Sequence, residues 1–414
     1  TAMLPRAYIN PPGHWVTDPP LPYSQAVRCG EMLFTTGQMA LDNTLKVIAP
    51  GNLNGQIDAA IKDLIGVLDA GGMSASDLVQ MRAFYVDEPA ATFESVATQI
   101  AKALGPLAGP GPALTVAPVQ AMMSPGPLFE IEAIAMRGQN GETLARTAAW
   151  DPNWAGPPSP FSHALRVGEM CFTSGVTAKS HSAIEAPGDL TGQSHAVVHR
   201  IDGLLQQLGA DINDTVKTNI FNVEAGTTED WAAPALARAS YYHEPGPAAT
   251  GLSLKSLRPK GLMIINDVVA MRGHDGARLP RSHVWPDNHW DWTVHLPYRH
   301  GIRCGDLIFL GGQVPLNPDA SVAHKGDLKA QTNMAMEYIR RVLAEMNLDF
   351  GHVLRINTFY ATGDKADTDE HIRKENLHAR FAHFEPPGPA TTGIPMPYLA
   401  YENMNIEIDI IAMV

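Results

Sequence analysis

The chain has 414 residues, of which 45% are hydrophobic, 18% charged and 7% aromatic, a composition typical of a folded protein with several domains. The formal net charge of -13 argues against nucleic acid and anionic membranes as partners, because binding to phosphates requires a basic face. Three widely separated cysteines, Cys29, Cys171 and Cys304, favour neither a disulfide framework nor a thiolate zinc site. Since neither a signal peptide nor a membrane-spanning apolar run is visible, we expect a cytoplasmic protein.

The most informative feature is a threefold internal repeat. The run LPYSQAVRCGEMLFTTGQ begins at Leu21, and related runs begin at Ser159 (SPFSHALRVGEMCFTSGV) and Leu296 (LPYRHGIRCGDLIFLGGQ). Equivalent prolines and glycines in these runs are spaced by 138 and 137 residues. They are Pro22, Pro160 and Pro297, and Gly37, Gly175 and Gly312. The spacing predicts three domains over 1–140, 141–277 and 278–414, here called repeats 1, 2 and 3, and repeat 2 carries the most degenerate motif.

The residue pattern of each repeat predicts the same order of strands and helices, ββαβαββ. After the opening strands, Gly51, Gly188 and Gly326 each precede Asn-Leu or Asp-Leu and a stretch with apolar side chains at helical spacing. A β-rich run follows, over 81–86, 218–223 and 356–361, and then a second helix that ends near 104, 243 and 384. A Gly-Pro-Ala turn leads into two closing strands. Because two helices cover one face of a sheet, the other apolar face needs a partner.

We therefore expect α+β domains that form a pseudo-trimer within one chain. The same sheet face of the other two repeats is the simplest partner for each open face, which places the sheets inward and the helices outward. Clefts between adjacent repeats are then the natural ligand sites.

The opening run, the Gly-Pro-Ala turn and the closing Glu-Ile-Glu-Ala-Ile-Ala together resemble the Rid (reactive intermediate deaminase) or YjgF family. The resemblance covers all three repeats and implies chorismate-mutase-like domains with ligand sites between subunits. It also implies a hydrolase that deaminates a small enamine or imine metabolite without metal or organic cofactor, with a 2-aminomuconate-type intermediate of aromatic catabolism as the concrete expectation. A non-catalytic metabolite-binding protein is the alternative, and a higher homo-oligomer of pseudo-trimers is left open.

This chain departs from the family pattern at the position that binds the substrate carboxylate. Deaminating relatives carry an Arg after Pro-Ala, because a guanidinium can grip a carboxylate with two parallel hydrogen bonds. The three equivalent residues here are Leu114, Ala249 and Thr391. The sequence leaves open what replaces the Arg.

Two other features of the family site are present in repeats 1 and 3 and absent from repeat 2. The carboxylate that orients water is Glu130 and Glu407, with Ile265 in repeat 2; the pocket tyrosine is Tyr23 and Tyr298, with Phe161 in repeat 2. An unpaired carboxylate on an apolar strand is costly, so we expect the two Glu to do acid, base or water-orienting work, with a salt-bridged structural role as the alternative. The substrate-binding residues expected beside them are the two tyrosines, Gly37, Gly312 and Thr391.

Repeat 3 has an additional aromatic and histidine-rich segment over 283–300. Alternation along an extended strand places His300 on the same face as Tyr298, which makes it a candidate proton carrier, although a structural role is also consistent with one His. Trp290 and Trp292 either pin one repeat to the next or form a wall of the substrate pocket. The 16 histidines of the chain form no recognisable metal motif, so no metal is expected.

Overall fold

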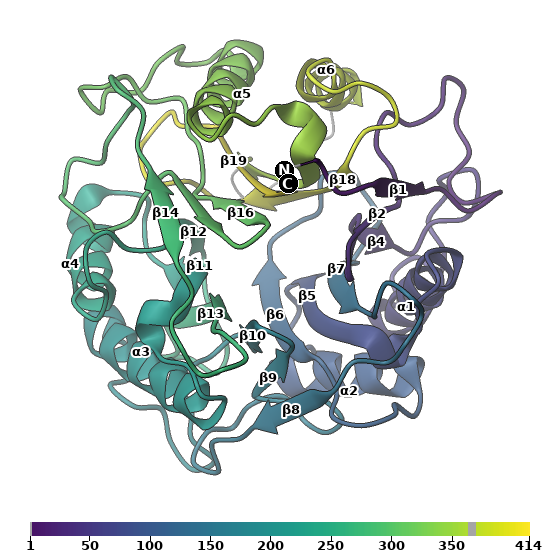
Figure 1. The fold of residues 1–414 in the computed structure, drawn as a ribbon, viewed down its shortest axis with the longest axis horizontal. Helices are drawn as coiled ribbons and strands as arrows, with labels where there is room; N and C mark the ends of the chain where they lie inside the picture. The colour runs from purple at the N-terminus through teal and green to yellow at the C-terminus, as the bar shows by residue number, and fades with distance from the viewer. Residues whose placement is uncertain (1, 363–369) are drawn as a thin grey trace.

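The computed structural model describes residues 2–362 and 370–414 and shows three α+β units arranged as a ring around a central axis (Figure 1). The three sheets face the axis, and the helices lie on the outside of the ring. This confirms the predicted pseudo-trimer, in which each sheet finds a partner for the apolar face that its own helices leave open. In the described part of the chain, no helix is both long and apolar enough to span a bilayer.

Each unit contributes a sheet and two α-helices. Repeat 1 contains β1 Arg6–Ile9, β2 Ala26–Cys29, β3 Met32–Thr35, β4 Gln38–Met39, α1 Leu53–Ala70, β5 Leu78–Val86, α2 Phe93–Leu104, β6 Ala113–Val119 and β7 Phe129–Met136. Repeat 2 contains β8 Arg146–Ala149, β9 Ala164–Val167, β10 Met170–Thr173, α3 Leu190–Gln207, β11 Thr215–Val223, α4 Thr228–Ala239, β12 Ala248–Leu254 and β13 Ile264–Met271. Repeat 3 contains β14 Arg281–Val284, β15 Gly301–Cys304, β16 Leu307–Leu310, α5 Leu328–Glu345, β17 Val353–Ala361, α6 Glu370–Phe381, β18 Ala390–Met396 and β19 Ile406–Met413.

All three sheets have the same strand order, β1-β2-β3-β7-β5-β6 in repeat 1. β5 and β6 are parallel, which the crossover helix α2 permits, and the other pairs are antiparallel. The first strand of each unit, β1, β8 or β14, was not predicted from the sequence. These edge strands are only four residues long, too short for a clear alternation of polar and apolar residues.

The first helix of each repeat begins at the signal that the sequence predicted. Asn52, Asp189 and Asp327 cap α1, α3 and α5, and each side chain accepts a hydrogen bond from the backbone N–H three residues later. The preceding glycines have φ values of 72°, 76° and 78°, a left-handed conformation that favours glycine. The Gly-Asn-Leu and Gly-Asp-Leu landmarks therefore mark a turn and a helix cap.

The inner faces of the sheets meet in one shared apolar core on the axis. It includes equivalent phenylalanines of the three repeats, Phe34, Phe172 and Phe309, all buried. Beside this core lies a buried polar layer in which Arg82 faces Glu132 and Asp267, Lys217 faces Asp409, and Arg355 faces Glu132. Buried charges are tolerated when they are paired in this way.

Adjacent repeats are joined by equivalent backbone hydrogen bonds at all three interfaces. The N–H of Gly37 donates to Thr391 O at 3.0 Å, that of Gly312 to Ala249 O at 3.0 Å, and that of Gly175 to Leu114 O at 3.1 Å. Each bond joins the glycine next to the last residue of an opening motif to the strand after the Gly-Pro-Ala turn of a neighbouring repeat. The motif of one repeat thus lies against the closing strands of another.

Candidate functional site

The interface between repeats 1 and 3, here called cleft 3/1, contains a cavity of about 240 Å³. Repeat 1 contributes Tyr23, Gly37 and Glu130 to its lining, and repeat 3 contributes Arg380 and Thr391. The first three belong to the opening and closing motifs, whereas Arg380 comes from the outer helix α6. Cleft 3/1 therefore combines, in one cavity, groups that are far apart in the sequence.

Glu130 is held beneath the glycine of the opening motif. A Cβ atom at Gly37 would lie 2.1 Å from Glu130 Oε1, so only glycine leaves room for this carboxyl group. Burial, followed by the negative charge of Glu132, raises the pKa of Glu130 from 4.5 to about 8. At neutral pH Glu130 is consequently a carboxylic acid that can donate a proton.

Tyr23 lies beside this acid and beside the helix that closes the cleft. Its ring centroid is 6.0 Å from that of Phe381. Burial is the main cause that raises the pKa of Tyr23, the charge of Glu130 raises it further, and Arg380 acts in the opposite direction. The phenol therefore stays protonated at neutral pH and is a hydrogen-bond donor.

Arg380 is a buried cation whose partners among the described residues are all neutral. It is 5% exposed, and its Nε donates to Asn376 Oδ1 at 2.9 Å, while Nη1 has no hydrogen-bond partner. Among the described residues no carboxylate forms an ion pair with it. Since an uncompensated buried charge is unfavourable, a guanidinium with free donor capacity at a cavity is suited to bind an anionic ligand.

A second cavity, of about 80 Å³, lies in cleft 2/3 between repeats 2 and 3. Arg238 and Glu224 of repeat 2 line it, together with Trp292 and Tyr298 of repeat 3. Arg238 is 5% exposed and lacks a carboxylate partner among the described residues. Tyr298 has its pKa raised to about 12, with burial as the main cause.

At the third interface, seam 1/2, apolar side chains take the positions of the polar cleft residues. Residues equivalent to the Tyr, the Glu and the first residue after Gly-Pro-Ala are all buried there: Phe161, Ile265 and Leu114. A Cβ at Gly175 would meet Ile265 Cγ2 at 2.7 Å, which shows that Ile265 occupies the place of the carboxyl group. Seam 1/2 therefore lacks the polar groups of the other two clefts.

A buried arginine is present at the same two interfaces that have the Tyr and the Glu. The Arg comes from one repeat, and the Tyr and Glu come from the adjacent repeat. Position eleven of the outer helix is Arg380 in α6 and Arg238 in α4, but Ala103 in α2. Each Arg faces an adjacent repeat that has both the Tyr and the Glu. Ala103 is in repeat 1, and the adjacent repeat 2 has Phe161 and Ile265 at those positions. Neither arginine was predicted from the sequence, because both lie on outer helices, away from the strand position after Pro-Ala.

The structure brings some of the predicted site residues together and separates others. Tyr23, Gly37, Glu130 and Thr391 line cleft 3/1, and Tyr298 and Trp292 line cleft 2/3. Glu407 lies under Gly312, with a pKa raised to about 8 by burial and by Asp409, but it does not line the cavity of cleft 2/3.

His300 and Trp290 lie in a buried cluster behind cleft 2/3. His300 Nε2 is 3.0 Å from Trp290 O, and Nδ1 is 3.2 Å from Gln313 Nε2. Trp290 Nε1 donates to Gln313 Oε1 at 3.0 Å. Both ring nitrogens of His300 are engaged, and burial lowers its pKa to about 2, which favours the structural alternative over proton transfer. In the same segment Trp290 is buried within this cluster, whereas Trp292 lines the cavity of cleft 2/3.

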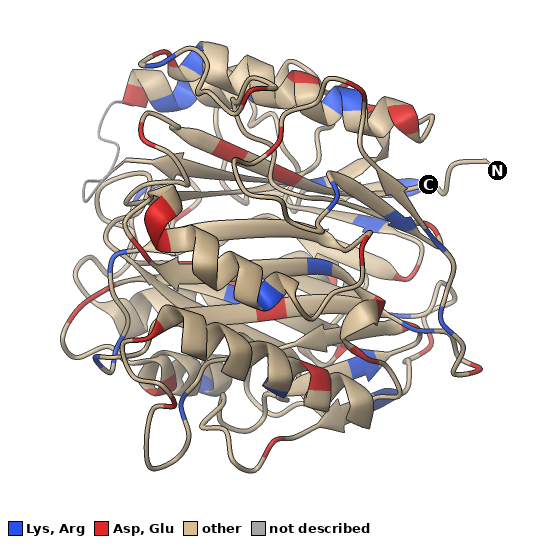
Figure 2. Ribbon diagram, turned by 90° about the vertical axis from the view of Figure 1, so that its left-hand side faces the viewer, with Lys and Arg blue, Asp and Glu red and all other residues tan. Residues whose placement is uncertain are grey.

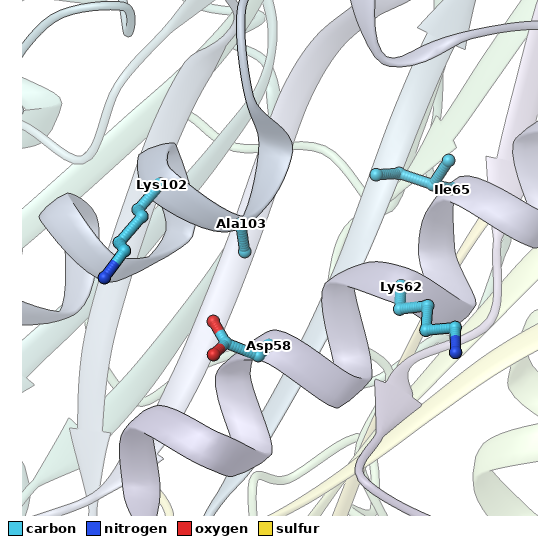
Figure 3. Close-up of a pocket in the computed structure, with 5 residues that line it drawn as sticks. All are labelled: Asp58, Lys62, Ile65, Lys102 and Ala103. Atoms are coloured by element: carbon cyan, nitrogen blue, oxygen red, sulfur yellow. The ribbon is translucent and has the colours of Figure 1, made fainter.

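A shallow groove on the outside of repeat 1 offers no comparable chemistry. Asp58, Lys62, Ile65, Lys102 and Ala103 line it between α1 and α2, and the two lysines point away from each other (Figure 3). Its three charged residues are exposed. In the parts of the chain that the structure describes, no three His, Cys, Asp or Glu side chains form a potential metal site.

The fold and its clefts define a protein built from three tandem domains of one α+β class, with its polar sites between domains. The family model described as endoribonuclease L-PSP matches residues 17–137, 154–271 and 293–414. The chain belongs to this family, which is the Rid or YjgF family that its motifs resemble.

Individual relatives match one repeat, and a solved structure matches most of the ring. Protein DfrA from Myxococcus xanthus is 32% identical over 120 residues, which are 28% of this chain and 85% of that protein. The RutC family protein YjgH from Escherichia coli is 25% identical over 136 residues, 33% of this chain and 97% of its own. A chorismatase crystal structure aligns with a TM-score of 0.52 at 13% identity over 81% of this chain and 93% of its own, a likeness of fold.

Proposed function

We propose that cleft 3/1 catalyses the hydrolytic deamination of a small anionic enamine or imine. The observation that carries the proposal is the presence, in one cavity, of a protonated Glu130 and of Arg380, a buried cation without an ion-pair partner among the described residues. Arg380 binds the substrate carboxylate in place of the family's strand Arg. Its position explains how the chain dispenses with an Arg at Leu114, Ala249 and Thr391.

Each step of the reaction uses a group of cleft 3/1. Glu130 donates its proton to the β-carbon of the enamine, the C=C bond becomes C–H, and the nitrogen becomes an iminium. The carboxylate then accepts a proton from a water molecule as its oxygen attacks the iminium carbon. Glu130 then gives this proton to the nitrogen of the resulting amino alcohol, and ammonia leaves as the C=O bond forms. The hydroxyl group loses its proton to Glu130, which restores the carboxylic acid. The sum is enamine plus water giving a carbonyl compound plus ammonia.

The lining of the cavity supports a substrate with an apolar, unsaturated body. Trp15, Met39 and Met123 line cleft 3/1 beside the polar groups, and Tyr23 can donate a hydrogen bond to the developing carbonyl oxygen. A 2-aminomuconate-type compound is the concrete candidate. Reaction in the cytoplasm is part of the proposal.

The test is release of ammonia from a panel of enamines that includes 2-aminomuconate. We expect Glu130→Gln to lower kcat/KM about a hundredfold or more, because a positioned acid is lost, while Ile265→Val in seam 1/2 keeps wild-type activity. Circular dichroism melting curves check that both variants are folded. Full activity of Glu130→Gln would show that another group transfers the proton.

The alternative is a metabolite-binding protein without catalysis, and the same panel distinguishes it. Binding measured by calorimetry, with no ammonia released from any panel member, would favour that alternative. Chorismate is included because a chorismatase shares the fold over most of the chain. Turnover of chorismate, which contains no nitrogen, together with no ammonia release from any enamine of the panel, would refute deamination as the reaction of this site.

A further inference from the structure

Cleft 2/3 contains a carboxylate, that of Glu224, which has no counterpart in cleft 3/1. Glu224 follows β11 and lines the cavity together with Arg238. It accepts hydrogen bonds from Ser253 Oγ and from the N–H of Gly226 at 2.6 Å. The equivalent residue is Thr362 in repeat 3, and in repeat 1 it is Asp87, which pairs with Arg258 at 3.2 Å. Within the described residues, Glu224 has no cationic partner.

Two opposite charges thus line one cavity without touching each other. Arg238 and Glu224 each influence the other electrostatically, but their charged atoms form no ion pair. Arg238 Nη1 donates to Ser194 Oγ at 3.0 Å and to Asn222 Oδ1 at 3.3 Å, and its buried Nε has no partner. Among the described residues, Arg238 Nε lacks an acceptor and the Glu224 carboxylate lacks a cation. A ligand that carries both a negative and a positive charge would satisfy the two groups.

The remaining wall of the cavity is aromatic. Trp231 and Trp292 meet edge to face, with ring centroids 5.8 Å apart, and both line the cavity. Trp231 Nε1 donates to Ala400 O at 3.0 Å, which fixes its ring. Indole faces attract organic cations, especially where water is excluded.

We propose that cleft 2/3 is a binding site for a small zwitterionic amino acid, with the carboxylate on Arg238 and the ammonium between Glu224 and the two tryptophans. The cavity of about 80 Å³ limits the ligand to one with few atoms beyond the α-carbon, such as glycine, alanine or serine. This site is separate from cleft 3/1, and the proposal is independent of the reaction assigned there.

The experiment is calorimetric titration of the full chain with glycine, L-alanine and L-serine. Propionate and ethylamine are matched probes that lack the ammonium and the carboxylate of alanine, respectively. We expect at least one amino acid to bind, and both probes to bind at least tenfold more weakly than alanine. Quenching of tryptophan fluorescence gives a second readout, which Trp292→Phe should diminish.

Variants assign the ligand to the cleft. Glu224→Gln and Arg238→Met should each weaken binding at least tenfold, whereas Glu229→Gln, on the exposed start of α4, should not. Arg380→Met removes the proposed carboxylate grip of cleft 3/1 and should leave amino-acid binding unchanged, so failure of one proposal is distinguishable from failure of the other.

Three results would overturn the inference. They are no binding of any of the three amino acids, propionate binding as tightly as alanine, and unaltered binding by Glu224→Gln. If Arg238→Met fails to fold, as judged by its melting curve, Glu224→Gln and the two probes still decide the question.

Discussion

At the scale of single residues, the burial of two glutamates has a cost in stability. The pKa values of Glu130 and Glu407 rise from 4.5 to about 8 in the folded chain. Between these values the folded state binds more protons than the unfolded state, so the two groups make folding less favourable as pH rises. Each contributes a slope of at most about 1.4 kcal/mol per pH unit.

A variant with Glu130→Gln and Glu407→Gln should therefore gain stability relative to the wild type as pH rises from 5 to 8. The measurement is the free energy of unfolding in urea at pH 5, 6.5 and 8. Exposed Glu345→Gln is the control and should show no growing difference. A difference between the double variant and the wild type that is constant or shrinks with pH would mean that the two carboxyl groups are ionised in the folded chain.

At the scale of elements, the central strands depend on buried ion pairs. Lys217 Nζ on β11 is 3.0 Å from Asp409 Oδ2 on β19 and 2.9 Å from Leu310 O, across the interface between repeats 2 and 3. Burial is the main cause that lowers the pKa of Lys217, and Asp409 opposes this effect. Removing one member of such a pair leaves the other charge buried alone.

We expect Asp409→Asn to lower the free energy of unfolding by about 3–5 kcal/mol. The exposed pair of Lys329 and Glu375, 3.3 Å apart, provides the control, because Glu375→Gln should cost less than about 1 kcal/mol. Urea unfolding measures both. Equal, small losses would indicate that water reaches Lys217.

The sequence predicted most helices and strands because their signals are local. The cap residues of α1, α3 and α5 follow their glycines directly, and the apolar spacing of each helix lies within one segment. The second helices end slightly earlier than predicted in repeats 2 and 3, at Ala239 and Phe381, because turns follow them before the next prolines.

The cleft residues were only partly predictable, since each site combines two repeats. Tyr23 and Glu130 stand in motifs that can be compared along the chain. Arg380 stands on a helix of another repeat, and its partnership with those motifs appears only once the order of repeats around the ring is known. Comparing the outer helices with an offset of one repeat would have detected Arg238, Arg380 and the contrasting Ala103.

At the scale of the whole molecule, fusion of three domains frees each interface to differ. A homotrimer repeats one interface three times, whereas this chain has two polar clefts and one apolar seam. The charged side chains are spread over the outer helices and loops (Figure 2), while the paired charges near the axis are buried. At seam 1/2 the apolar Phe161 and Ile265 stand where the other two interfaces have Tyr and Glu, and Glu224 lines cleft 2/3.

The hydrogen bond from Gly37 to Thr391 also bears on the order of events during folding. It joins repeats that are not consecutive in the chain, and closing so long a loop costs more conformational entropy than joining neighbours. Contacts between distant segments form slowly. After dilution from urea, helical circular dichroism should therefore recover before the ammonia release proposed for cleft 3/1, and Glu130 should become buried only when the ring closes. Simultaneous recovery of both signals would instead indicate that the first and last repeats associate as early as their own helices form.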